Sequence, residues 1–357
     1  MGGQKMQKTD HFSSEYGALS RRSFMKMSGL LGLSLASAGL IPATAEAVKF
    51  NRKSYKVSRT ELTMGTFVTM TLIHASKDKA QEAMGHAFEE IDRLTKSMNR
   101  FDENTAIAEL NSQGFLREVP PEVAGVVARA LYFHRLSGGA FDISVKPIVD
   151  LFRKKFGGTH KQAPTTIELT RALKLVGSDK IELKGRTIRF NKPGMGITLD
   201  GIAKGYIVDK ASNILSDSQI KNHLINAGGD IKAMGAKDRK PWTVAIQDPR
   251  KKKEYQDVIH ISGGAVATSG NYEIYYDREK MVHHIIDPRT GLSPHLSTSV
   301  SVLAGTAMDA DALSTSVFVM DPVNGVRFID SIPECECLVI AKGDNKIKSA
   351  GWKSAAI

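Results

Sequence analysis

The chain has 357 residues, 41% of them hydrophobic and 24% charged, with a formal net charge of +11 at pH 7. These values are ordinary for a soluble globular protein, and the length allows one large domain, or two closely packed ones, with a substantial core. The positive charge suits an anionic ligand, an acidic partner or a membrane surface. With only Cys335 and Cys337, the composition excludes a disulfide framework and indicates no zinc site.

The N-terminus has the organisation of an export signal. Ser20–Lys26 (SRRSFMK) precedes a weakly apolar run over residues 27–41, and small residues follow. The arginine pair resembles a twin-arginine signal. We therefore divide the chain into a signal peptide, residues 1–47, and a mature domain, residues 48–357. An uncleaved anchor or a disordered tail is the alternative, although the apolar run is too short for a stable membrane span. We expect a periplasmic protein exported by the twin-arginine route.

The mature chain mixes strands and helices without a regular βαβ repeat, which favours an α+β sandwich over a Rossmann or barrel fold. A polar lead-in over 49–57 precedes an alternating strand at 67–73, and apolar faces predict helices at 79–98 and 122–136. Residues 152–164 are expected to form a loop. Further elements are a hairpin at 181–190, strands at 224–231, 242–246, 258–261, 265–268, 281–286, 297–303 and 337–341, and helices at 309–320 and 323–332.

A basic run, residues 250–253, lies between two of these strands. It has no interleaved aromatic side chains, so it is typical of a solvated loop rather than of a nucleic-acid site.

The central stretch of the chain turns from strand to helix. Residues 196–198 read as the end of a strand, and apolar residues from Ile202 onward follow helical spacing, so the turn falls at Asp200-Gly201 with Lys204 in the first helical turn. A helix start offers unpaired N–H groups and a positive dipole end, where a phosphate fits, and a lysine adds a point charge. Because glycine-containing turns of this kind are common, a purely structural turn is the alternative.

Two later runs complete a pattern with the turn Gly201–Gly205 (GIAKG). They are His283–Gly291 (HHIIDPRTG) and Ala310–Thr315 (ADALST). The ordered set resembles the signature of the ApbE family of FAD:protein FMN transferases, and the resemblance extends from about Thr63 to Phe318. It implies an α+β fold, a mixed α/β sandwich of ApbE type, with a ligand cleft between two packed halves. Further matching motifs are Met64–Thr66, Asn99–Asp102, Gly139–Asp142, Asn226–Asp230 and Ala267–Gly270.

Asp311 and Thr315 are four residues apart at a helix start, so their side chains share one face. A carboxylate and a hydroxyl suit Mg²⁺, which usually shares its shell with substrate phosphates. The alternative is that Asp311 caps the helix while Thr315 faces the core. The resemblance implies the carbonyl of Gly201 as the third metal contact, with Lys204 on the phosphate oxygens.

The resemblance also implies a set of contacts to FAD. Thr198 stands where many family members have an aspartate, and Phe101 is an aromatic side chain that suits stacking on a flavin or adenine ring. His284 is the candidate general base, with Asp311 as the second catalytic residue, whereas Asp287 is expected to shape the Asp-Pro-Arg-Thr-Gly turn. The contacts implied are Met64, Phe101, Ala140, Phe141, Asp142, Thr198, Lys204 and Ile286.

The reaction implied is Mg²⁺-dependent transfer of FMN from FAD to a threonine or serine hydroxyl of an acceptor protein, with release of AMP. The acceptor implied is an electron-transfer subunit. Two alternatives stay open: hydrolysis of FAD to FMN and AMP at the same site, and FAD binding or delivery without catalysis.

Overall fold

We describe the fold from a computed structural model, in which the described residues are 46–157, 162–237, 239–250, 255–272, 275–277 and 282–355. The signal peptide predicted for residues 1–47 lies outside them, apart from Glu46 and Ala47, which begin the first strand. Most of the predicted basic loop, residues 251–254, also lies outside.

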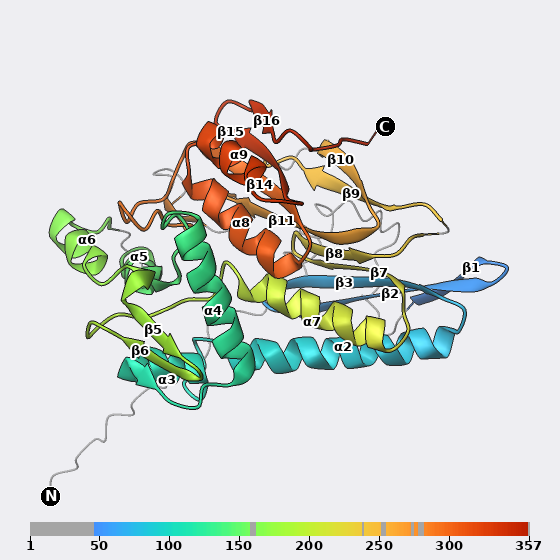
Figure 1. The fold of residues 1–357 in the computed structure, drawn as a ribbon, viewed down its shortest axis with the longest axis horizontal. Helices are drawn as coiled ribbons and strands as arrows, with labels where there is room; N and C mark the ends of the chain where they lie inside the picture. The colour runs from blue at the N-terminus through green and yellow to red at the C-terminus, as the bar shows by residue number, and fades with distance from the viewer. Residues whose placement is uncertain are drawn as a thin grey trace, which may run out of the picture.

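A nine-stranded sheet forms the centre of the molecule (Figure 1). Each strand pairs antiparallel with its neighbours. In spatial order the strands are β1 (Glu46–Asn51), β2 (Ser54–Thr63), β3 (Thr66–His74), β7 (Asn222–Ala227), β8 (Asp230–Met234), β11 (Gly263–Gly270), β14 (Ser297–Ala304), β15 (Glu336–Ala341) and β16 (Lys346–Lys348).

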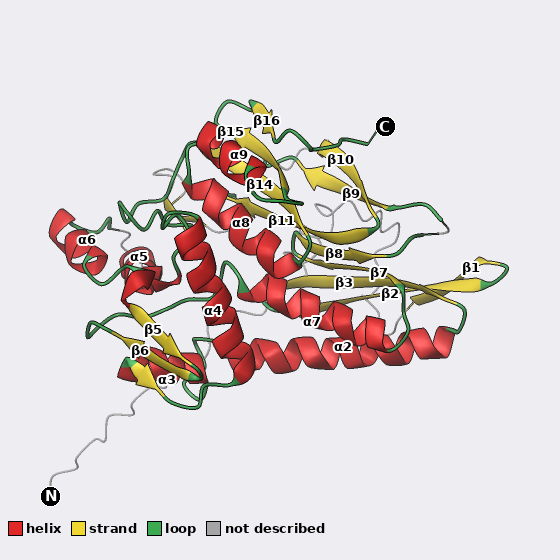
Figure 2. Cartoon of the chain, in the orientation of Figure 1, coloured by secondary structure: helices red, strands yellow, loops and turns green. Residues whose placement is uncertain are grey.

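Different elements cover the two faces of this sheet. Helices α2 (Lys77–Met98), α7 (Ala203–Asp217) and α8 (Ala307–Val319) pack on one face, where Val68, Met70 and Leu72 of β3 enter the main core (Figure 2). A ribbon of β9 (Trp242–Gln247) and β10 (Tyr255–Ile261) packs against the other face, in a second apolar cluster that includes Ile73, Trp242 and Trp352. Residues of β3 contribute to both clusters because successive side chains of a strand point to opposite faces of the sheet.

A smaller group of elements lies at one end of the sheet (Figure 1). Apolar residues of this group belong to the same main core as the sheet, so the two halves are packed together as the sequence predicts. Its members are α3 (Ala106–Gln113), α4 (Pro121–Leu136), α5 (Lys146–Phe156), α6 (Thr166–Leu173), the sheet β4-β6-β5 (Phe115–Leu116, Thr187–Phe190, Ile181–Lys184), and the ribbon of β12 (Tyr275–Asp277) and β13 (Val282–His283). Helix α9 (Pro322–Asp330) packs instead beside α8 and against β15.

The prediction of a strand ending at residues 196–198 is wrong, because this segment joins no sheet. Instead, the side chain of Asn111 in α3 forms hydrogen bonds with both backbone groups of Ile197. The Ile197 N–H donates to Asn111 Oδ1 at 2.6 Å, and the Ile197 carbonyl accepts from Asn111 Nδ2 at 3.0 Å. The N–H of Thr198 donates to the carbonyl of Ile143 at 2.8 Å. These partners satisfy the backbone without a neighbouring strand.

Three other expectations need correction. Residues 152–164 are not wholly loop, because α5 continues to Phe156, and Pro147 stands in its first turn, where a missing N–H costs nothing. The polar lead-in at 49–57 belongs to β1 and β2, at the edge of the sheet, where one face is solvated. The strand expected at 281–286 is restricted to Val282–His283.

The described helices include none that is both long enough and apolar enough to cross a membrane.

Candidate functional site

The turn before α7 is built as the sequence predicts. The N–H of Ala203 donates to the carbonyl of Leu199 at 2.8 Å, and α7 begins at Ala203, so Lys204 stands in its first turn. Gly205 follows at the closest approach of α7 to α8. A Cβ atom added to Gly205 would lie 2.2 Å from the carbonyl oxygen of Ala307, so only glycine fits there.

Helix α8 is capped by residues other than Asp311. The side chain of Thr306 accepts from the N–H of Asp309, and Asp209 of α7 accepts from the N–H groups of Ala307 and Met308 at 2.9 Å each. Asp311 lies in the second turn, 6% exposed, and its Oδ2 accepts from the N–H of Gly205 at 3.1 Å. The alternative that Asp311 is a helix cap is therefore wrong.

The structure brings Gly201, Thr315 and Asp311 to one place. A Cβ atom added to Gly201 would lie 3.1 Å from Oγ1 of Thr315, one turn after Asp311 on α8. The hydroxyl of Ser269 in β11 lies 3.3 Å from the Thr315 hydroxyl, within hydrogen-bonding distance. Residues far apart along the chain are thus brought together at the junction of α7 and α8.

Charge is concentrated at this junction. Lys204 Nζ lies 3.3 Å from Oδ2 of Asp230, which begins β8 and is 1% exposed. Burial raises the pKa of the Asp311 carboxyl well above its ordinary value, the negative charge of Asp230 raises that pKa further, and Lys204 opposes both. A cation beside Asp311 would stabilise its charged form.

These donors fit a small divalent cation of the Mg²⁺ kind. All three candidate ligands are oxygen atoms: the Asp311 carboxylate, the Thr315 hydroxyl and the Gly201 carbonyl. The surroundings of Asp311 disfavour its charged form unless a cation is present. Mg²⁺ prefers oxygen ligands and completes its shell with waters and substrate phosphates. No cluster of three or more His, Cys, Asp or Glu side chains suited to a metal occurs among the residues that the structure describes. A metal site here would therefore depend on neutral oxygen donors as well as on Asp311.

The predicted FAD contacts fall into two groups by exposure. Ala140, Phe141, Thr198 and Ile286 are all less than 10% exposed. The side chain of Asp142 is also buried, and its carboxylate accepts from the N–H and hydroxyl groups of both Ser144 and Ser178. Surface for a ligand comes instead from the other three predicted contacts, namely Met64, Phe101 and Lys204.

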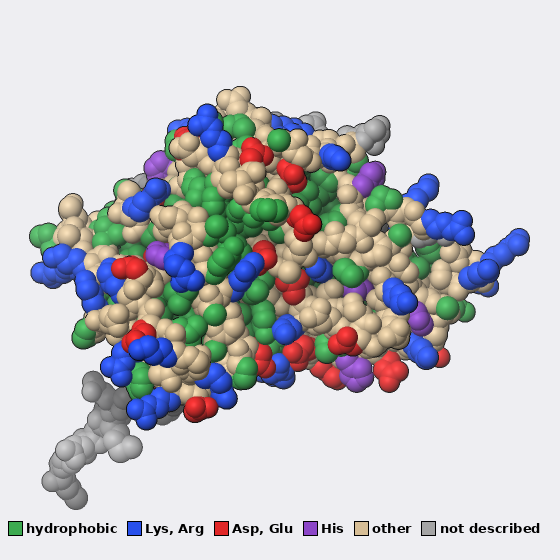
Figure 3. Space-filling model, in the orientation of Figure 1, with side chains coloured by type: hydrophobic (Ala, Val, Ile, Leu, Met, Phe, Trp, Pro, Cys, Tyr) green, Lys and Arg blue, Asp and Glu red, His purple; other side chains and the backbone are tan. Residues whose placement is uncertain are grey.

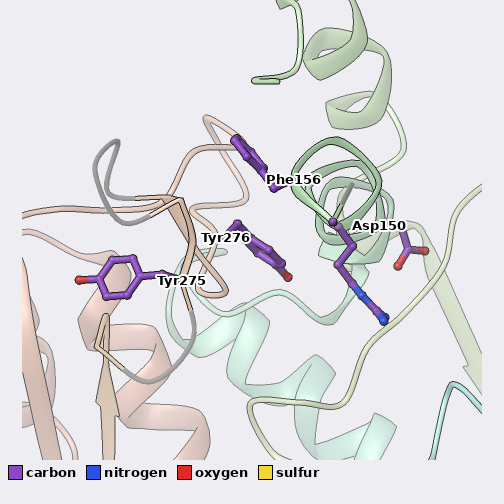
Figure 4. Close-up of a pocket in the computed structure, with 6 residues that line it drawn as sticks. Asp150, Phe156, Tyr275 and Tyr276 are labelled. Atoms are coloured by element: carbon purple, nitrogen blue, oxygen red, sulfur yellow. The ribbon is translucent and has the colours of Figure 1, made fainter. Parts of the chain in front are cut away.

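Phe101 contacts two guanidinium groups. Those of Arg100 and Arg153 lie 4.3 and 4.4 Å from the ring centroid, and the ring remains 44% exposed. Beside it, a cleft of about 590 Å³ opens between α5 and β12, lined by Asp150, Arg153, Phe156, Gly157, Tyr275 and Tyr276. In Figure 4 the Tyr276 ring is directed toward α5 and the Tyr275 ring points the opposite way. Phe101 therefore lies at the edge of a cleft with room for part of a small molecule.

The two neighbouring histidines differ in environment. His283 is fully buried, its Nε2–H donates to the carbonyl of Pro294 at 2.9 Å, and its ring lies edge-on to Phe318 of α8. His284 is partly exposed and lies beside His283 with ring centroids 6.3 Å apart. Of the pair, His284 is the one accessible to a substrate. Asp287 shapes the following turn as predicted, since its carboxylate accepts from the backbone and side chain of Arg289.

The environment of His283 predicts a pH dependence of stability. Burial lowers the pKa of His283 from 6.5 to about 4. Between these values the unfolded chain binds a proton that the folded chain does not, so stability falls as the pH falls. We expect the free energy of unfolding to drop by up to about 3 kcal/mol from pH 6.5 to pH 4 through this group. Urea unfolding across this range should show a steeper pH dependence for the wild type than for His283→Asn, whereas exposed His295→Asn should keep the wild-type dependence.

Sequence reasoning missed several residues of the junction. The sequence places Asp230 in the motif Asn226–Asp230 without indicating a role for it, yet its carboxylate pairs with Lys204. Asp209 and Arg100 were given no role. Asp209 lies in α7, five residues after Lys204, and nothing in the local sequence indicates that it caps the start of α8.

The fold is an α+β sandwich, and a lysine, a buried carboxylate and a hydroxyl lie close together near the start of one helix. This arrangement is typical of proteins that bind an anionic ligand together with a cation. Comparison with known proteins narrows this class. A family model described as the ApbE family matches residues 64–339. The chain belongs to the ApbE family.

Curated relatives and solved structures agree with this assignment. The FAD:protein FMN transferase of Haemophilus influenzae is 31% identical over 281 residues, which cover 74% of this chain and 80% of that protein. The FAD:protein FMN transferase of Treponema pallidum is 31% identical over 321 residues, which cover 82% and 87%. The crystal structure of the ApbE protein from Thermotoga maritima has a TM-score of 0.75 at 29% identity and covers 83% of this chain and 97% of its own.

Proposed function

We propose that this chain is a FAD:protein FMN transferase, an enzyme that moves FMN from FAD to a threonine or serine hydroxyl of an acceptor protein and releases AMP. The observation that carries the proposal is the junction of α7 and α8, where Lys204, Gly201, Asp311 and Thr315 meet at a helix start. Curated relatives that align over most of the chain bear this name. An anionic diphosphate such as that of FAD fits a helix start flanked by a lysine.

The residues of the junction take separate roles toward the diphosphate. Lys204 Nζ, held beside Asp230, faces the phosphate oxygens as a point charge. Asp311, Thr315 and the Gly201 carbonyl would hold Mg²⁺, which when bound supplies charge neutralisation of the phosphoryl oxygens. The exposed Phe101 ring and the partly buried Met64 offer apolar surface for a ring of the nucleotide.

The transfer step is displacement at phosphorus. The acceptor hydroxyl oxygen bonds to the phosphorus on the FMN side, the bond from that phosphorus to the bridging oxygen breaks, and AMP leaves with the electron pair. We assign the role of accepting the hydroxyl proton to His284; its partial exposure supports this choice over His283, which is buried and hydrogen-bonded to the carbonyl of Pro294. Positioning by the chain, more than covalent chemistry, then sets the rate.

We further propose that the enzyme works in the periplasm, after export by the twin-arginine route, on an electron-transfer subunit. The support is the arginine-pair motif near the N-terminus, in residues outside the described part. Cleavage after Ala45 keeps the whole of β1, whereas cleavage after Ala47 removes its first two residues.

Mass spectrometry tests the transfer directly. Mature protein is incubated with FAD, Mg²⁺ and a candidate electron-transfer subunit, and both proteins and the nucleotides are analysed. We expect an FMN-sized adduct on a threonine or serine of the acceptor, with one AMP released for each adduct, and no adduct when EDTA replaces Mg²⁺. Free FMN and AMP without an adduct would favour FAD hydrolysis, and intact FAD would favour binding alone.

A further inference from the structure

A buried arginine connects the junction of α7 and α8 to the cleft beside Phe101. The Arg100 side chain is only 6% exposed. Its Nη1 donates to Asp150 of α5 at 3.2 Å, and its Nη2 donates to Asp200 at 3.3 Å. The same guanidinium lies 4.3 Å from the centroid of the adjoining Phe101 ring. One cation thus joins the loop after α2, helix α5 and the turn before α7.

The turn before α7 is held from two sides. On the inner side, Gly201 lies close to Thr315 and Phe141, because a Cβ atom added to it would lie 3.1 Å from Thr315 Oγ1 and 3.5 Å from the Phe141 ring. On the outer side, the side chain of the neighbouring Asp200 is 60% exposed and forms an ion pair with Arg100. The position of the Gly201 carbonyl therefore depends on both contacts, and Arg100 supplies the outer one.

Stability alone does not account for this arrangement. The Nε of Arg100 is buried and has no acceptor within the described ranges. A buried donor left without an acceptor destabilises the folded state. The negative charge of Asp200 also acts on the Asp311 carboxyl, so the bridge lies within electrostatic range of the proposed metal ligands.

We propose that Arg100 is a positioning residue of this active site: by bridging Asp150 and Asp200 it fixes the Gly201 carbonyl for the divalent cation and Phe101 for the nucleotide ring. The inference rests on the proposed function. It says that one residue, Arg100, positions both the metal-binding turn and the aromatic ring that would contact the nucleotide. Arg100 acts through Asp200 and Phe101. It is distinct from the residues that hold the cation.

Metal-dependent FAD binding tests this role without requiring turnover. FAD fluorescence and calorimetry are followed as Mg²⁺ is titrated into wild type, Arg100→Gln, Arg100→Lys and Asp200→Asn. We expect the Mg²⁺ concentration at half-maximal FAD binding to rise on the order of tenfold in all three variants, as is usual when a partner of a metal ligand is removed. Lysine should not restore it, since one ammonium cannot reproduce the planar fork that binds two carboxylates.

Two comparisons separate positioning from general destabilisation. Arg93→Gln is the matched control, because Arg93 also bridges two carboxylates, Glu90 and Glu122, but outside the site. It should leave the Mg²⁺ dependence unchanged. The double variant of Arg100→Gln with Asp200→Asn should bind no more weakly than the weaker single variant, because the two side chains act as one unit.

Wild-type Mg²⁺ dependence in folded Arg100→Gln would overturn the inference. If that variant fails to fold, Asp200→Asn decides, because the Asp200 side chain is largely exposed and the substitution removes the negative charge that pairs with Arg100. FAD binding by the wild type without any Mg²⁺ dependence would overturn both this inference and the proposed metal site. Mg²⁺-dependent binding without transfer would overturn only the proposed transferase reaction.

Discussion

Asp311→Asn is expected to reduce FMN transfer by about 10³-fold while the protein stays folded. The amide oxygen can still accept from the N–H of Gly205, so the contact between α7 and α8 is kept. What is lost is the one charge among the proposed cation ligands. Burial and the charge of Asp230 both disfavour the ionised carboxyl, so its removal relieves repulsion in the absence of a cation. We therefore expect a thermal midpoint no lower than that of the wild type.

A matched substitution on the same helix isolates this effect. Asp309 lies two residues earlier, and its carboxylate binds Arg129 through two hydrogen bonds at 2.7 and 2.8 Å. Asp309→Asn removes a similar charge and weakens a partly exposed ion pair, which typically costs 1 kcal/mol or less. We expect near wild-type transfer from it by the mass-spectrometric assay. Equal activity of the Asp309 and Asp311 variants would contradict the assignment of Asp311 to the cation.

Much of the site could be predicted because its parts are local patterns. Lys204 in the first turn of α7 follows from an apolar spacing and a glycine turn, and the shared face of Asp311 and Thr315 follows from a separation of four residues. The family resemblance then supplied Gly201 as their partner, and the structure brings it beside Thr315.

The parts that escaped prediction depend on contacts between distant segments. Residues 196–198 have the apolar, β-branched character of a strand, but Asn111, 86 positions away from Ile197, takes its backbone hydrogen bonds. The pairing of Arg100 with Asp200 spans 100 residues, and neither side chain has a local pattern that indicates the other. By contrast, the capping box of Thr165 and Glu168 that begins α6 is a local signal that the sequence does contain.

The molecule also arranges its basic side chains in a way that composition alone does not predict. Figure 3 shows hydrophobic side chains gathered in the middle of one face, over α4 and α8, with lysine and arginine mostly toward its rim. Acidic side chains also lie in the middle of this face, so the case for an acidic partner depends on the net charge of +11 rather than on this distribution.

Gly205→Ala is expected to have the largest effect on stability. The new methyl group would lie 2.2 Å from the carbonyl oxygen of Ala307 and 2.8 Å from Cα of Met308, and both are backbone atoms that cannot rotate away. Helices α7 and α8 must then separate, at a cost of about 3 kcal/mol in the free energy of unfolding. Because the Gly205 N–H donates to Asp311, the same separation moves Asp311 away from Gly201, so FMN transfer should fall with stability.

Gly85→Ala is also a glycine-to-alanine substitution, but we expect it to raise the free energy of unfolding rather than lower it. Gly85 lies within α2, and a Cβ atom added there meets nothing within 4 Å, so alanine should stabilise the helix by about 0.5–1 kcal/mol. Urea unfolding followed by circular dichroism measures both variants. If the two substitutions shifted stability in the same direction, close packing of α7 against α8 could not be what requires glycine at position 205, and the junction would have to tolerate a wider separation than the structure shows.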